Sequence, residues 1–207
     1  MPQRSQVRLF AQLLEQYEPN IRRAFMAGVA DLYANVDWKA LISALQAQDL
    51  NAAVNALNIS ADAWNEYAAM KSEVYARAGA ATAAQITQAG IAGIGVRFQL
   101  TNPEAQRWIS ENIGDMITRI TREQVENVRT VIADGFSKGE HPHTIARDII
   151  GRVNRISGKR EGGVLGLDGP RAERLHAVTV GMRTKEGVQD LVIRHQDGSL
   201  SVRYKVN

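Results

Sequence analysis

Apolar residues that recur every three or four positions are the feature that most constrains the fold of this 207-residue chain. One such stripe follows Pro103 and contains Ala105, Trp108, Ile109, Ile113, Met116, Ile117 and Ile120. A similar stripe over residues 4–35 contains Leu9, Leu13, Ile21, Phe25, Val29 and Leu32. Because this spacing places the apolar residues on one face of a helix, we predict a mainly α-helical protein.

Residue types that favour helix ends divide the first part of the chain. Pro19 is expected to interrupt or kink the helix over 4–35, because proline has no N–H for the bond to residue i−4. Asp37 and Asp49 are predicted to cap two short helices, and Ser60 to cap a long one. These helices form the predicted N-terminal arm or bundle.

A cluster of glycines marks the predicted domain boundary. Glycines at positions 90, 93 and 95 end the long helix, whose last part, 78–92, is so rich in small residues that another backbone can approach it closely. We therefore predict an N-terminal helical region over 1–96 and a compact helical domain with a C-terminal β-hairpin over 97–207.

Three helices are predicted at the start of the second domain. Asn102 and Pro103 form a helix start with proline at the first helical position. Thr121 and Gln124 have the spacing of a capping box, which predicts that a new helix begins there. A third helix is expected to open at Pro142, and the short joints predict a compact antiparallel unit.

The last segments differ in character. Residues 154–169 are polar and rich in glycine, and predict a loop; Asp168 is then expected to start a helix that runs to about Met182. Residues 191–195 and 200–206 alternate in polarity around an Asp-Gly pair, which strongly indicates a β-hairpin. Because a lone two-stranded hairpin is marginal in water, we expect it to pack on other elements.

Composition excludes several classes of function. The chain has no cysteine, so disulfides, thiolate metal sites and a cysteine nucleophile are absent. It contains no apolar run of about 18 residues, so no membrane-spanning helix is expected. The N-terminus lacks the apolar core of a signal peptide, and we expect the chain to remain in the compartment where it is made.

Basic charge is concentrated near the C-terminus. Residues 1–151 carry 14 Lys/Arg and 16 Asp/Glu, a net −2, whereas residues 152–207 carry 11 and 6, a net +5. The candidate binding residues in this last quarter are Arg152, Arg155, Lys159, Arg160, Arg171, Arg174, Arg194, Arg203 and Lys205. Three interpretations stay open: contact with DNA phosphates, docking on an acidic protein surface, or a solvated basic face.

Motifs for catalysis or cofactor binding fail in detail. The glycine-rich segment 158–163 lacks the preceding strand and the Lys-Ser/Thr pair of a phosphate-binding loop, and the glycines at 90–95 have the wrong spacing for a dinucleotide site. His141 and His143 are expected to point apart across Pro142 and to lack a third metal ligand. His176 and His195 have no nearby partner in the sequence. We therefore predict no catalytic, cofactor or metal site and no enzymatic activity.

An ordered set of short segments resembles a known family. The segments are NPEAQRWI (102–109), ITREQV (120–125), IADG (132–135), GEHP (139–142) and IARDI (145–149). Their succession is similar to that of the head morphogenesis, or minor capsid, proteins of tailed bacteriophages and prophages, the Mu F-like and SPP1 gp7-like proteins. GVLGL (163–167), followed by a helix with Arg171 and Ala172, adds to a resemblance that covers about residues 97–183.

The resemblance implies a structural role. Members are minor head proteins, present in few copies, that associate with the portal, and with the major capsid or scaffold protein, during head assembly or DNA packaging and ejection. It implies a location in the virion, in the head interior or at the portal vertex, after synthesis in the bacterial cytoplasm. Some members continue into fused toxin or transferase domains, which leaves open that this chain is the delivery arm of a toxin-fused prophage protein. The basic C-terminal quarter leaves a second alternative open, a non-sequence-specific DNA-binding module.

Overall fold

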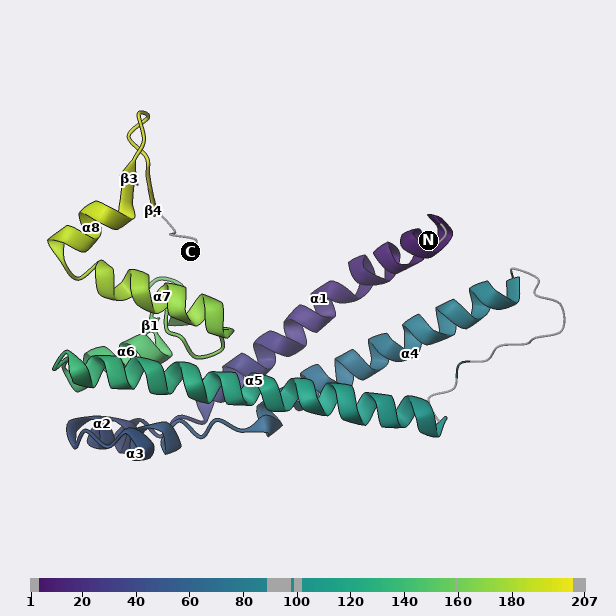
Figure 1. The fold of residues 1–207 in the computed structure, drawn as a ribbon, viewed down its shortest axis with the longest axis horizontal. Coiled ribbons are helices and arrows are strands. Elements are labelled where there is room, and N and C mark those ends of the chain that lie inside the picture. The colour runs from purple at the N-terminus through teal and green to yellow at the C-terminus, as the bar shows by residue number, and fades with distance from the viewer. Residues whose placement is uncertain (1–3, 89–97, 99–101, 159, 203–207) are drawn as a thin grey trace. The chain divides into compact units, whose positions relative to one another are not determined.

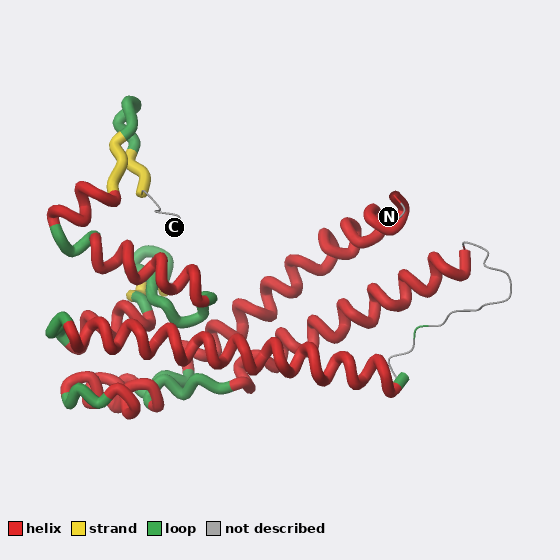
Figure 2. Tube along the Cα trace, viewed as in Figure 1, coloured by secondary structure: helices red, strands yellow, loops and turns green. Residues whose placement is uncertain are grey.

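The computed structural model describes residues 4–88, 98, 102–158 and 160–202, and it is mainly α-helical, as predicted (Figures 1 and 2). In chain order the helices are α1 (Arg4–Ala34), α2 (Trp38–Gln46), α3 (Leu50–Asn55), the 3-10 helix η1 (Ala61–Trp64), α4 (Asn65–Gln88), α5 (Pro103–Ser137), α6 (Pro142–Ile150), α7 (Gly169–Gly181) and α8 (Lys185–Leu191). The strands are β1 (Arg152–Val153), β2 (Arg160–Glu161), β3 (Val192–Arg194) and β4 (Leu200–Val202).

The chain forms two compact units whose limits differ from the predicted boundary near residue 96. Unit 1 is Met1–Asp31 with Ser60–Thr121, and unit 2 is Leu32–Ile59 with Arg122–Asn207. The difference arises because the short helices of the N-terminal half pack with the C-terminal half: α2 packs against both α3 and α6. The glycines at 90, 93 and 95 lie outside the described residues.

Local capping signals of the sequence are confirmed. The side chains of Asp37 and Asp49 accept hydrogen bonds from the N–H of Ala40 and of Ala52, each at 2.9 Å. Asp168 caps α7 in the same way. Asn102 caps α5, Pro103 is its first residue, and α6 begins at Pro142 as expected.

Two helix limits in unit 1 depart from the expectation. Helix α1 is not interrupted at Pro19 but continues from Arg4 to Ala34, since proline removes only one backbone donor of the helix. Ser60 caps the 3-10 helix η1 rather than α4 itself, since its hydroxyl accepts from the N–H of Asp62 at 3.0 Å. Helix α4 follows directly.

The predicted break between two helices at Thr121 is wrong. Helix α5 continues without interruption for 35 residues, from Pro103 to Ser137. The Thr121 hydroxyl donates to the carbonyl of Ile117 inside the helix, at 2.9 Å. Gln124, the expected partner in the capping box, is directed instead to the backbone of residues 166–167. The predicted three-helix antiparallel unit is therefore one long helix followed by α6.

Aromatic residues form the core of unit 1. Trp64 is fully buried, and its ring stacks on Phe25 of α1 with centroids 5.1 Å apart. Gly28 makes this approach possible, because a Cβ at that position would lie 2.6 Å from the Ala63 carbonyl oxygen. Further along, Tyr75 of α4 stacks on Trp108 of α5 at 4.2 Å.

Aliphatic residues form the core of unit 2. Its fully buried side chains are Leu32, Leu41, Leu45, Leu57, Val128, Ile132, Ile145, Ile149, Ile150, Val164 and Leu165. They come from α1, α2, α5, α6, the turn after α3 and the segment before α7, and burial of this set holds the unit together.

Two small antiparallel hairpins complete unit 2. Strand β1 pairs with β2, Arg152 opposite Glu161 and Val153 opposite Arg160. Strand β3 pairs with β4 around the predicted Asp-Gly turn, where Gly198 has a φ of 81°. The sequence interpretation did not include β1, β2 or α8, and α8 contacts both α7 and β3.

Candidate functional site

The hairpin β1–β2, residues 152–161, carries the centre of the predicted basic surface, and we call it the basic hairpin. It begins where α6 ends at Gly151, whose φ is 75°. A Cβ on Gly163 would lie 2.3 Å from the Gly151 nitrogen, so the two ends of the hairpin cross at a point where only glycine fits.

Asn154 organises the turn of the basic hairpin. Its Oδ1 accepts hydrogen bonds from the N–H of Ile156 and of Ser157, at 2.8 and 3.2 Å. Its Nδ2 donates to a carboxylate oxygen of Glu161 at 2.7 Å, across the two strands. The turn that carries Arg155 is therefore held by side-chain hydrogen bonds as well as by the ladder.

Aromatic rings support the base of the basic hairpin. The Arg160 guanidinium lies 5.0 Å from the centre of the Trp38 ring and 5.8 Å from that of Tyr33. The Tyr33 hydroxyl donates to the Leu165 carbonyl at 2.9 Å. Burial raises the pKa of Tyr33, and the charge of Arg160 partly offsets this rise. Cation–π contact thus fixes one arginine of the set in place.

The rest of the basic hairpin presents both charge and apolar surface. Arg152 and Arg155 are exposed, and between them lies Val153, which is 53% exposed. Ile156 at the turn is 98% exposed, more than any other large apolar side chain in the part of the chain that the structure describes. A fully exposed isoleucine next to arginines is typical of a binding surface rather than of the packed face of an element.

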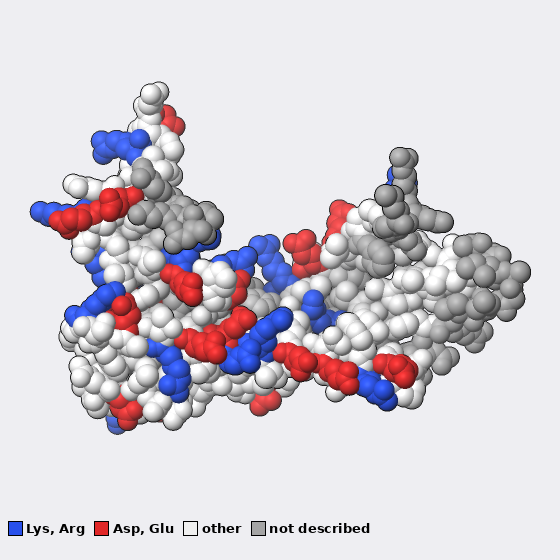
Figure 3. Space-filling model, in the orientation of Figure 1, with Lys and Arg blue, Asp and Glu red and all other residues white. Residues whose placement is uncertain are grey.

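The other predicted binding residues are distributed over separate elements. Arg171 forms an ion pair with Asp168 at 2.7 Å, and Arg174 is exposed further along α7. Arg194 is exposed on β3, in the second hairpin. Lys159, Arg203 and Lys205 lie outside the described residues. The structure thus brings Arg152, Arg155 and Arg160 together on one hairpin. On the face that Figure 3 shows, basic and acidic side chains are interspersed.

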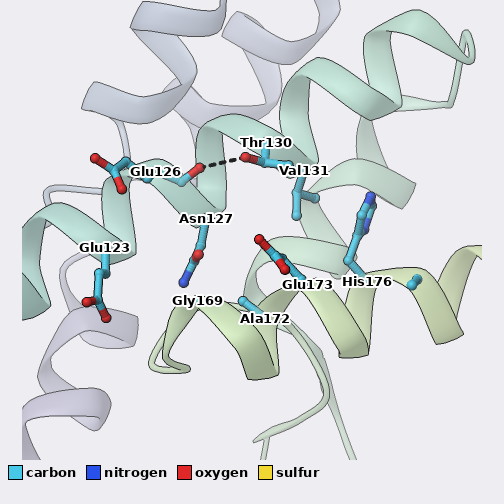
Figure 4. A pocket seen from close by; sticks show the side chains of 10 residues that line it. Glu123, Glu126, Asn127, Thr130, Val131, Gly169, Ala172, Glu173 and His176 are labelled. Atoms are coloured by element: carbon cyan, nitrogen blue, oxygen red, sulfur yellow. Dashed lines mark hydrogen bonds between the residues drawn. The ribbon is translucent and has the colours of Figure 1, made fainter. Parts of the chain in front are cut away.

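A pocket of about 370 Å³ lies between α5 and α7 (Figure 4). Its charged lining residues are the acidic Glu123, Glu126 and Glu173, and its floor includes Asn127, whose amide donates to the Leu167 carbonyl at 3.0 Å. In Figure 4 the α5 residues face those of α7 across the pocket, and the Thr130 hydroxyl is bonded back to its own helix at the Glu126 carbonyl.

His176 at the edge of this pocket is paired with a residue that lies far from it in the sequence. Its Nε2 lies 2.8 Å from Oδ2 of Asp134 on α5. A hydrogen bond from Lys138 lowers the pKa of the Asp134 carboxyl, burial opposes that change, and the contact with His176 lowers it further. His195 similarly contacts the Ser201 hydroxyl at 2.7 Å.

The His176–Asp134 pair lacks the geometry of a general base. The other ring nitrogen, Nδ1, is buried and has no hydrogen-bond partner in the part of the chain that the structure describes. A nucleophile or substrate would have to reach that nitrogen for proton transfer, and the packing closes it off. The pair therefore orients α7 against α5.

Asp148, seven residues after His141, is held by an arginine side chain. Both of its carboxylate oxygens accept from one nitrogen of Arg183, which also reaches Glu140 through its second nitrogen. The rings of His141 and His143 do not point apart as predicted, because they stack with centroids 5.4 Å apart. Within the described residues, no group of three or more His, Cys, Asp or Glu side chains could hold a metal ion.

The sequence located the basic segment but not what supports it. Tyr33 and Trp38 lie more than 120 positions before Arg160, and no local pattern connects them to it. The available signal in the sequence was a tryptophan directly after the predicted cap Asp37. In the described residues, no helix is both long and apolar enough to cross a membrane. Comparisons with protein families, with curated proteins and with solved structures find no match to this chain.

Proposed function

We propose that this protein is a structural minor head protein of a tailed bacteriophage or prophage, which binds the portal through its basic hairpin and supports head assembly or DNA packaging and ejection. The proposal implies few copies per particle, at the portal vertex or in the head interior. It is supported by the ordered segments over residues 97–183 that resemble the head morphogenesis family, and by the mainly helical build.

The single observation that carries the proposal is the surface of the basic hairpin. Ile156 is 98% exposed and Val153 is 53% exposed, and both lie next to exposed arginines. Arginine is enriched among the few residues that provide most of the energy of a protein interface, and the residues around it exclude water from the contact. A surface of this kind fits an acidic partner surface with an apolar centre.

Support beneath the hairpin favours binding without large rearrangement. Arg160 rests on Trp38 and Tyr33, and the crossing of Gly151 and Gly163 fixes both ends of the hairpin. A surface that is already ordered loses less conformational entropy when a partner docks. In the proposed mechanism, unit 2 is the rigid body and the basic hairpin is its contact with the portal.

Co-purification with the portal protein encoded by the same phage or prophage tests the proposal. The double variant Arg152→Glu, Arg155→Glu should weaken the complex at least about tenfold, because it reverses two charges at the contact. Arg77→Glu with Arg107→Glu is the matched control, since these arginines are also exposed but belong to unit 1. A chain that never associates with portal or capsid under assembly conditions contradicts the proposal.

DNA contact is the second candidate, favoured by the charge of the same segment. Between Gly151 and Glu161 the chain carries Arg152, Arg155, Lys159 and Arg160 and no carboxylate. Contact with phosphates predicts that log K falls with log salt by about 0.9 for each phosphate neutralised. Neutralising Arg155, Lys159 and Arg160 should then reduce that slope, whereas a flat salt dependence excludes this candidate.

A further inference from the structure

The C-terminal segment of unit 2, residues 169–202, has little apolar attachment to the rest of that unit. It contains α7, α8 and the hairpin β3–β4, and we call it the C-terminal arm. Among its described side chains only Ala172, in the first turn of α7, is buried. Apolar residues further along α7, such as Leu175 and Val178, are half-buried. Burial of apolar surface therefore holds mainly the start of the arm.

Two cavities separate α7 from the elements beside it. The pocket of about 370 Å³ lies between α7 and α5, and its lining from α7 includes the small residues Ala172 and Ala177. A second cavity, of about 600 Å³, lies between the end of α7, α6 and the basic hairpin, where Val178 and Met182 face the hairpin residue Arg152 across it. Atoms that border a cavity lack packing partners on that side, so this surface of α7 gains little dispersion energy.

Charged side chains join the arm to the rest of unit 2. His176 of α7 contacts Asp134 of α5, with Nε2 and Oδ2 2.8 Å apart. Arg183, just after α7, donates to Asp148 of α6 and to Glu140, which precedes α6. The side chains of Glu140 and Asp148 are 15% and 7% exposed, so one guanidinium holds two nearly buried carboxylates. Loss of this one side chain would release both contacts.

The arm is packed within itself and has a glycine at its base. A Cβ on Gly181 would lie 2.6 Å from Cδ1 of Leu191, so α8 packs closely on the end of α7. At the base, Gln124 of α5 holds the backbone of residues 166–167, and α7 opens at Gly169. The short link between these held residues and α7 is therefore a pivot about which the arm can turn.

We propose that the C-terminal arm swings away from the rest of unit 2 as one body, with the contacts of His176 and Arg183 as its latch. Elements with few buried apolar contacts open at a lower free energy than the core of the same domain. Opening widens the cavity of about 600 Å³ and gives a partner access to the face of the basic hairpin that carries Arg152. Only this consequence rests on the proposed portal function, and the opening itself does not.

Labelling of a single engineered thiol in the full chain, at constant pH, measures the opening. The protein contains no cysteine, so Val131→Cys introduces one thiol. Val131 is 3% exposed and borders the cavity between α5 and α7, so a bulky thiol reagent reaches it when the arm is open. Ala44→Cys is the matched control, because Ala44 is also buried but lies on α2, which borders neither cavity. The thiol at position 131 should react at least about tenfold faster than that at position 44.

Arg183→Gln tests the latch. Combined with Val131→Cys, it should raise the labelling rate at least about tenfold, because two carboxylates lose their shared partner in the closed state. Arg194→Gln is the matched control and should leave the rate unchanged: Arg194 is exposed on β3 of the same arm and takes part in none of the ion pairs of the described residues. Labelling of Ala44→Cys should not change with either variant.

Ala177→Leu should shift the equilibrium in the other direction. Ala177 lines the cavity of about 370 Å³, so leucine adds apolar surface between the arm and α5 and should slow labelling of Val131→Cys at least about threefold. Equal labelling rates at positions 131 and 44 without further substitution overturn the proposal. It is also overturned if Arg183→Gln raises both rates by the same factor, because unit 2 then unfolds as a whole and the arm does not move separately.

Discussion

Gln124 and Leu167 are separated by 43 positions, yet the side-chain amide of Gln124 donates to the Leu167 carbonyl at 2.7 Å. Oε1 of the same side chain accepts from the N–H of Gly166 at 2.6 Å. Gln124 is only 2% exposed, so one buried side chain satisfies two backbone groups of the segment before α7. This contact joins the middle of α5 to the start of α7 within unit 2.

Replacement of Gln124 by leucine should destabilise unit 2. The substitution leaves the buried N–H of Gly166 without a partner, whereas the Leu167 carbonyl keeps its bond from Asn127, so we expect a cost of about 1–3 kcal/mol in the free energy of unfolding. Urea unfolding followed by circular dichroism measures the change. Gln106→Leu, at an exposed position of α5, should alter stability by no more than about 0.5 kcal/mol, and equal effects at both positions would contradict the account.

The same residue shows where sequence interpretation succeeds and where it fails. Caps such as Asp37, Asp49 and Asp168 were predicted correctly, because the acceptor and the amide that it binds are at most three residues apart. Thr121 and Gln124 have capping-box spacing, but Gln124 binds backbone far along the chain and α5 continues through both. A local pattern cannot reveal a long-range partner that competes for the same side chain.

Two glycines of α5 should respond in opposite directions to substitution by alanine. At Gly135 a Cβ would lie 2.6 Å from Cγ1 of Ile145 on α6, so Gly135→Ala should cost about 1–3 kcal/mol through overpacking. At Gly114 nothing lies within 4 Å, so Gly114→Ala should stabilise the helix by about 0.5–1 kcal/mol. Thermal unfolding separates the two, and a gain at Gly135 would show that α6 does not pack there.

Arg183 should stabilise the fold through its contact with the buried side chain of Asp148. The Asp148 side chain is 7% exposed and that of Arg183 is 31% exposed, so Arg183→Met leaves a nearly buried carboxylate without its bidentate partner. We expect a loss of about 2–4 kcal/mol in the free energy of unfolding, smaller than for a fully buried pair. The double variant with Asp148→Asn should recover part of this loss, and strict additivity in the double-mutant cycle would contradict a direct interaction.

Acidification should remove the contribution of Asp134. Its pKa is lowered in the folded state, so the carboxylate stabilises the fold at pH values above its ordinary, unfolded-state pKa, and this stabilisation is lost as pH falls through the lowered value. Asp134→Asn should therefore lower Tm near pH 7, and the difference from wild type should shrink below about pH 4. A difference that stays constant down to about pH 2 would contradict this assignment, and exposed Asp115→Asn serves as the control.

The candidate site was predictable only in part. The basic character of residues 152–160 is evident from charge counts, because a run of arginines and a lysine needs no tertiary information. Its support by Tyr33 and Trp38 depends on how α1 and α2 pack within unit 2, which no local spacing encodes. The pairing of His176 with Asp134 was missed for the same reason, since the two residues lie on different helices.

Imaging of the portal vertex, in particles assembled with and without this protein, tests the central proposal most directly. The account predicts additional density on the portal when the wild-type chain is present, and its loss in particles made with the Arg152→Glu, Arg155→Glu variant. Identical portal vertices with and without the protein, in particles of normal yield and DNA content, would contradict it.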